Sequence, residues 1–218
     1  MHRISKYKIT SKNIDSTAGR VLSDKDFLKV MSEYEKTLVV PDKGKKGVIL
    51  CPVGQVGAGK TTVVKPLAKK LGLLRISMDE IRRILLRDGF NLVRTKEMFL
   101  QLMLKYLDRG YDFVVDADCS RDVSLIKKIA KDYGKKVIWI HVKPPEKYIL
   151  NKLKNYKHSW LFKDSAEAIA CYRALKNIRR GVEKRIKFFY TFDPSKPDLN
   201  KQVERFLVKL NKESTVGR

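Results

Sequence analysis

The feature that most constrains this fold is a glycine-rich loop placed between an apolar run and an amphipathic run. The loop follows the strand pattern of residues 48–51 and consists of Gly54, Gln55, Val56, Gly57, Ala58, Gly59, Lys60 and Thr61. Glycines let the backbone curl so that successive N–H groups point at one phosphate, and the positive end of the next helix adds to this attraction. The pattern predicts a nucleotide phosphate site rather than a glycine-rich turn with an incidental lysine.

Each polar residue of this loop has an expected role. We expect ATP as the nucleotide, with Lys60 bridging its β- and γ-phosphates and Thr61 offering its hydroxyl to Mg²⁺. Thr62 can add a further phosphate contact. ATP and Mg²⁺ are therefore the predicted cofactors.

Strand and helix patterns alternate from the loop to the end of the chain. Short apolar runs predict five strands, at about 48–51, 74–77, 113–116, 137–142 and 188–192. Helical patterns cover about 60–71, 80–87, 95–109, 123–133, 146–154, 165–187 and 199–210. This order predicts an α/β, three-layer P-loop NTPase fold, in which helices flank a five-stranded parallel sheet and ligands bind beyond the carboxyl ends of the strands.

The chain divides into a catalytic region and two short flanks. Residues 1–45 are a polar extension with one amphipathic helix at about 24–36, which we expect to pack on the edge of the main domain. The P-loop domain is expected at 46–212, with a basic lid at about 152–185, and 213–218 is expected to be a tail. The function of the extension does not follow from its sequence.

Acidic residues follow two of the predicted strands. Asp79 opens a helix just after the second strand, where it could cap the helix or act as a general base toward an attacking hydroxyl. Arg82, one turn later, could hold an anionic part of the substrate. Asp116 ends an apolar strand, where a carboxylate is costly to bury, and Asp118 lies two residues further on. Either could be the acidic partner of Mg²⁺, and Arg121 could reach the same cleft.

The lid region is strongly basic. Phosphoryl transfer needs mobile cations that close over the phosphates. We expect one or two such residues among six candidates, which are Lys152, Lys154, Lys157, Arg173, Arg179 and Arg180. The aromatic residues of the lid loop could stack on a base or anchor the lid, and they are His158, Trp160 and Phe162.

Composition narrows the partners and the compartment. The formal net charge of +24 favours an anionic substrate, a nucleic acid among them, although lysine can also simply fill solvated surface. Three widely spaced cysteines, Cys51, Cys119 and Cys171, are typical of core thiols in a reducing compartment. No apolar run approaches the ~20 residues of a membrane span. We expect a cytoplasmic protein with no membrane partner.

The pattern resembles the small P-loop kinases, a group that includes polynucleotide kinases, zeta toxins, gluconate kinases and nucleoside monophosphate kinases. The matching parts are the loop 54–61, the segment 77–82, the strand end at 116–118, and 190–193 before the last helix. The resemblance implies a central P-loop strand, ATP as donor, Asp79 at the acceptor hydroxyl, and a lid after the fourth strand. This chain departs from the group in having Lys152 and Lys154 where arginine is frequent, and Asp118 in place of a small hydroxyl residue.

Together these observations predict an ATP-dependent kinase that acts on a hydroxyl of a polynucleotide or a nucleotide-like substrate. A small-molecule kinase acting on a nucleotide sugar, a sugar or a nucleoside monophosphate is the second possibility. An RNA-binding ATPase switched by ATP is the third. Lys60, Asp79 and Arg82 are the predicted catalytic residues.

Overall fold

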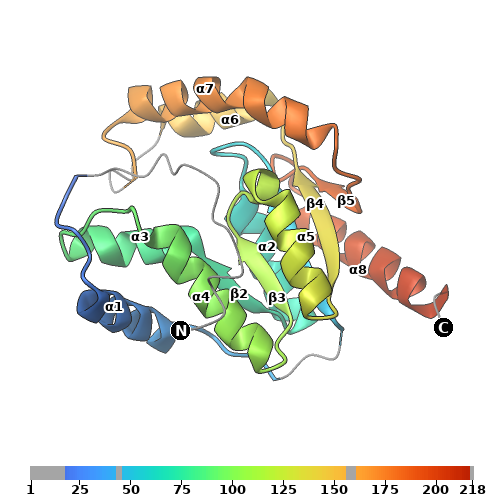
Figure 1. Ribbon diagram of the computed structural model, residues 1–218. Helices are drawn as coiled ribbons and strands as arrows, with labels where there is room; N and C mark the ends of the chain where they lie inside the picture. Colours follow the sequence, from blue (N-terminus) through green and yellow to red (C-terminus); the bar gives the residue numbers. More distant parts are fainter. Residues whose placement is uncertain (1–17, 43–45, 156–160, 217–218) are drawn as a thin grey trace.

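The computed structural model describes residues 18–42, 46–155 and 161–216. A five-stranded parallel sheet with the order β2-β3-β1-β4-β5 forms its centre (Figure 1). The strands are β1 (Val48–Val53), β2 (Leu74–Ser77), β3 (Phe113–Asp116), β4 (Lys136–Val142) and β5 (Tyr190–Phe192). The strand that precedes the glycine-rich loop, β1, is central, as the resemblance to the small P-loop kinases implies.

Helices cover both faces of this sheet. They are α1 (Asp24–Lys36), α2 (Lys60–Leu71), α3 (Met78–Arg87), α4 (Thr95–Asp108), α5 (Val123–Asp132), α6 (Glu146–Lys154), α7 (Ser165–Glu183) and α8 (Leu199–Val216), with a short 3₁₀ helix, η2, at Cys119–Arg121. Neighbouring residues of β1 point to opposite faces, so Ile49 packs into the cluster under α1, α3, α4 and α5, whereas Leu50 packs under α2 and α8. The expected three-layer α/β fold is confirmed.

The helix ends differ from the sequence prediction at two places. The helix expected over 165–187 stops at Glu183, and the strand expected from residue 188 begins only at Tyr190. Between them, Phe188 stacks on His141 of β4, with ring centroids 4.3 Å apart. The last helix continues beyond the expected residue 210 to Val216, since the next glycine or proline is Gly217.

The first helix packs against the main domain, as expected. Helix α1 lies beside α3 and α4 (Figure 1). Its Phe27, Val30 and Tyr34 are buried in the same cluster as residues of α3 and α4. Ser23 caps the helix, because its hydroxyl accepts a hydrogen bond from the Asp26 amide at 3.1 Å. Cys51 and Cys119 are buried and Cys171 is half-buried, in agreement with core thiols. Within the described ranges, no helix is long and apolar enough to cross a membrane.

Candidate active site

The glycine-rich loop depends on glycine at both of its ends. A Cβ atom on Gly54 would lie 2.5 Å from the carbonyl oxygen of Val142, at the end of β4. Gly59 precedes α2 with a φ of 90°, a left-handed conformation that favours glycine, and a Cβ there would lie 3.0 Å from Pro194 Cγ. The loop is therefore held between the ends of β4 and β5, in front of the positive end of α2.

Lys60 lies at the mouth of this loop and is the point on which the charges of the site converge. Its Nζ donates to the carbonyl oxygens of Gly54 at 3.0 Å and Gln55 at 2.9 Å. Burial lowers the pKa of the Lys60 ammonium, and four nearby charges modify this effect. Three carboxylates raise the pKa and one guanidinium lowers it: Asp118, Arg179, Asp79 and Asp116. The structure thus brings four predicted site residues within electrostatic reach of the loop lysine.

Asp116 forms the acidic corner beside Thr61. Its Oδ1 accepts a hydrogen bond from Thr61 Oγ1 at 2.9 Å, and its Oδ2 accepts one from Arg75 Nε at 2.8 Å. The Asp116 side chain is only 3% exposed. Burial raises the pKa of this carboxyl, while Arg75 and Thr61 oppose the rise. Arg75 also pairs with Glu80 at 2.6 Å, so that β2, α3 and β3 are joined at this corner.

The donors at this corner fit Mg²⁺. A hydroxyl and a carboxylate are the hard oxygen ligands that the ion prefers, and Mg²⁺ commonly uses one or two carboxylates together with waters and substrate phosphates. Among residues 18–42, 46–155 and 161–216, no group of three or more His, Cys, Asp or Glu residues could hold a metal ion. Thr61 and Asp116 therefore suit an ion that arrives with a nucleotide rather than one held by protein groups alone.

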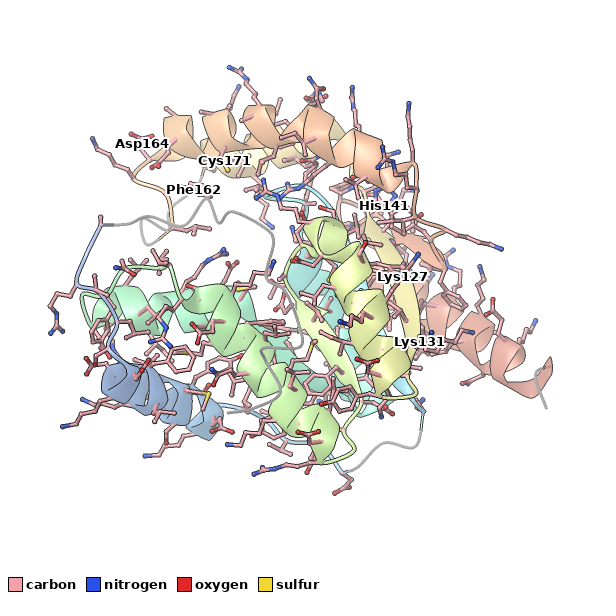
Figure 2. All side chains as sticks on the ribbon, viewed as in Figure 1. Lys127, Lys131, His141, Phe162, Asp164 and Cys171 are labelled. Atoms are coloured by element: carbon pink, nitrogen blue, oxygen red, sulfur yellow. The ribbon has the colours of Figure 1, made fainter. Side chains whose placement is uncertain are left out.

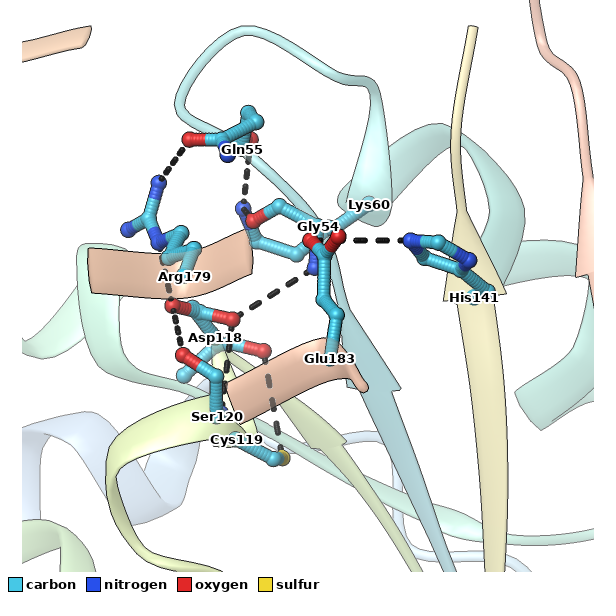
Figure 3. A network of polar contacts seen from close by, with 10 residues as sticks. Gly54, Gln55, Lys60, Asp118, Cys119, Ser120, His141, Arg179 and Glu183 are labelled. Carbon is cyan, nitrogen blue, oxygen red and sulfur yellow. Dashed lines mark hydrogen bonds and ion pairs between the residues drawn. The ribbon is translucent and has the colours of Figure 1, made fainter. Parts of the chain in front are cut away.

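Asp118 lies in a different network, which connects the loop to α7 (Figure 3). Its Oδ2 accepts from Arg179 Nε at 2.8 Å, and its Oδ1 accepts from the Gly54 amide at 3.4 Å. Arg179 Nη1 also donates to Gln55 Oε1 at 3.1 Å. The two carboxylates predicted for the metal are thus separated by their partners, and the geometry favours Asp116. A metal role for Asp118 stays a prediction.

Asp79 lies in the first turn of α3. The N-cap of this helix is Ser77, whose Oγ accepts from the Glu80 amide at 3.4 Å, so Asp79 is not the capping residue. Arg82 Nη1 donates to Asp79 Oδ1 at 2.9 Å, and the Asp79 side chain is 48% exposed. An exposed carboxylate near Lys60, oriented by an arginine one turn later, can accept a hydrogen bond from a substrate hydroxyl.

Of the five basic lid candidates that the structure describes, one, Arg179, contacts the phosphate loop and Asp118. Arg179 is buried, whereas Lys152, Lys154, Arg173 and Arg180 are exposed. Arg121, in η2, is exposed as well.

The one aromatic lid-loop residue that the structure describes is Phe162. It lies beneath α7 (Figure 2) and packs, partly buried, against the core cluster around α2, which fits an anchoring role. Lys157, His158 and Trp160 lie outside the described residues.

Sequence reasoning missed two members of the site. Arg75, which pairs with Asp116, interrupts the apolar strand β2, and a charge inside such a strand is a signal that could have identified it. Ser120 donates from its hydroxyl to Asp118 Oδ2 at 2.8 Å. Its sequence context carries no such signal.

The parallel sheet, the central P-loop strand and the carboxylates at the strand ends define a small P-loop protein with the fold of the P-loop kinases. The family model described as "AAA domain" matches residues 49–168. This is more than half of the chain of 218 residues, and the protein belongs to that family. No curated protein matches the chain.

Solved structures support the same fold. A structure of the PezAT chromosomal toxin-antitoxin system of Streptococcus pneumoniae is 19% identical, with a TM-score of 0.51, over 87% of this chain and 97% of that chain. A proposed kinase from Chloroflexus aurantiacus is 16% identical, with a TM-score of 0.54, over 73% and 96%. Shikimate kinase from Bacteroides thetaiotaomicron is 14% identical, with a TM-score of 0.50, over 75% and 97%. At such low identity these similarities concern the fold alone.

Proposed function

We propose that the protein is a kinase that uses ATP with Mg²⁺ and transfers the γ-phosphate to a hydroxyl of a polynucleotide or nucleotide-like substrate. The observation that carries this proposal is the set of contacts around the phosphate loop, at the carboxyl ends of the parallel strands. Lys60 Nζ donates to the carbonyl oxygens of Gly54 and Gln55. Thr61 donates to Asp116, Arg179 donates to Gln55, and Asp79 lies in the first turn of the neighbouring helix α3. A general base, a metal-side carboxylate and two cations are the groups that phosphoryl transfer requires.

Each group has a role in the transfer. The Asp79 carboxylate takes the proton of the acceptor hydroxyl, whose oxygen forms a bond to the γ-phosphorus. The bond from the γ-phosphorus to the β–γ bridging oxygen breaks, and ADP leaves with that oxygen. Lys60 and Arg179 stabilise the charge on the phosphate oxygens in the transition state. Mg²⁺ beside Thr61 and Asp116 would supply further charge neutralisation there.

The charge of the protein favours an anionic acceptor. The net charge is +24, and exposed cations continue from the site along the lid helices at Lys147, Lys154, Arg173, Arg180 and Lys184. Such a surface attracts polyanions and speeds their encounter with the site. A nucleic-acid end fits this field better than a neutral sugar does.

The test is transfer of labelled γ-phosphate from ATP to oligonucleotides with 5′-hydroxyl ends, nucleoside monophosphates, nucleotide sugars and simple sugars. Asp79→Asn should abolish transfer, and Asp88→Asn, at the other end of the same helix, should retain it. Transfer to a small molecule alone would replace the polynucleotide assignment by a small-molecule kinase. A fully active Asp79→Asn variant, with ATP hydrolysis stimulated by RNA, would refute the kinase and favour an ATP-switched RNA-binding protein.

A further inference from the structure

One buried polar group of the first helix contacts the start of α3, although α1 lies outside the residues 49–168 that the family model matches. Tyr34 is fully buried, with 0% of its surface exposed. Its hydroxyl accepts a hydrogen bond from the backbone amide of Ser77 at 2.7 Å. Ser77 is the last residue of β2 and the N-cap of α3, two positions before Asp79.

The amide of Ser77 needs this partner because of where β2 lies. β2 is the edge strand of the described sheet, and it pairs only with β3 there. An edge strand turns half of its backbone groups away from its neighbour, and a buried amide without a partner is costly. Ser77 is 2% exposed, so the Tyr34 hydroxyl replaces both the missing strand and water.

The same hydroxyl lies near the acidic corner. Ser77 pairs in register with Asp116 across β2 and β3. Burial raises the pKa of Tyr34, while the hydrogen bond from the Ser77 amide opposes the rise, and Glu80, Arg75 and Asp116 have smaller effects. Ser77, which Tyr34 contacts, thus lies next to Asp116 in the sheet and directly before the first turn of α3.

The helix that carries Tyr34 is held mainly by its buried side chains Phe27 and Val30, and salt bridges at its surface add to this. Arg94 pairs with Asp24 at 2.7 Å, Arg87 with Glu33 at 2.7 Å, and Lys105 with Glu35 at 2.7 Å. These contacts tie α1 to α3, to α4 and to the segment before α4. A helix packed into the core and contacted along its length can hold the Tyr34 hydroxyl against the Ser77 amide.

We propose that Tyr34 is a positioning residue, which fixes the start of α3 and thereby the Asp79 carboxylate relative to the phosphate loop. The kinetic part of this inference rests on the proposed function. Small displacements of a reacting group can lower turnover by about 100-fold. Helix α1, residues 24–36, would then contribute to catalysis by positioning Asp79, in addition to packing against the domain.

The experiment compares Tyr34→Phe with Phe27→Leu, a change at another buried position of the same helix, where Arg94 lies over the Phe27 ring. Tyr34→Phe should lower kcat roughly 10- to 100-fold while KM for ATP changes about twofold or less. It should also speed amide hydrogen exchange at Ser77 by about tenfold, the increase expected when the amide loses its one hydrogen-bond acceptor. Phe27→Leu should reduce stability but leave kcat and exchange at Ser77 near wild type.

Equal kcat values for the two variants, whether both normal or both reduced, would overturn the positioning role. If the wild-type protein phosphorylates no acceptor, the proposed function fails, and exchange at Ser77 still decides the structural part. Unchanged exchange at Ser77 in Tyr34→Phe would overturn it.

Discussion

Replacement of Arg75 by methionine tests the acidic corner of the site. The change keeps most of the apolar length of the side chain but removes the partner of Asp116, whose side chain is 3% exposed. Breaking a buried ion pair from one side costs about 3–5 kcal/mol, because the remaining charge stays buried. Glu80 also loses a partner, but its side chain is 36% exposed, and this loss should add at most about 1 kcal/mol. We expect the free energy of unfolding to fall by about 3 kcal/mol at pH 8.

This loss should depend on pH in a definite direction. Burial already raises the pKa of Asp116, and removal of Arg75 should raise it further. A carboxyl whose folded pKa exceeds its unfolded value of about 3.9 favours folding when it is protonated. The penalty is therefore complete above the folded pKa and shrinks as the pH falls toward the unfolded value. Urea denaturation should therefore show a smaller penalty at pH 5 than at pH 8.

The matched control is the double variant Arg75→Met with Asp116→Asn. Asparagine has nearly the same shape as aspartate but no charge to bury, so the double variant should be more stable at pH 8 than Arg75→Met alone. A loss below about 1 kcal/mol, or the same loss at both pH values, would refute the argument that Arg75 compensates a buried charge.

Three further changes test the loop and the lid. Lys60→Met should lower turnover by about 100-fold or more with the circular dichroism unchanged, and near-normal turnover would exclude a role in charge stabilisation. Arg179→Lys should reduce kcat at least about tenfold, because a lysine cannot donate to Asp118 and Gln55 at the same time as Arg179 does. The control is Arg180→Lys, a change at an exposed arginine of the same helix. Equal kcat values for the two variants would exclude a role of Arg179 in the site. In urea denaturation, Gly59→Ala should lower the free energy of unfolding more than Gly134→Ala does. Both glycines have a positive φ, but only at Gly59 would the added Cβ meet Pro194. Equal losses for the two variants would contradict this reasoning.

Most of the fold could be predicted from the sequence, because its signals are local. The glycine-rich loop, the apolar strands and the periodicity of the helices each depend on residues close together in the chain. The end of α7 could not be predicted, since residues 184–189 contain no glycine or proline to mark it, and Phe188 of this segment contacts His141 on a distant strand. Boundaries of this kind depend on tertiary contacts, which override local preference.

The site was predictable in its residues but less so in their partners. Lys60, Asp79 and Asp116 follow from strand ends next to a phosphate loop. The separate networks of Asp116 and Asp118 do not follow, since both aspartates belong to one short segment and only the contacts with Arg75 and Arg179 distinguish them. The contact of Tyr34 with Ser77 joins positions 43 residues apart, and no sequence motif marks it.

The central claim is that this site transfers phosphate to an acceptor rather than to water. The most direct measurement is the stoichiometry of ADP, phosphorylated acceptor and inorganic phosphate, formed from ATP by the wild-type protein with 5′-hydroxyl oligonucleotide or a nucleotide-like acceptor present. We predict that ADP and phosphorylated acceptor form in equal amounts, with little inorganic phosphate. If ADP and inorganic phosphate form in equal amounts and every acceptor stays unmodified, the account is contradicted.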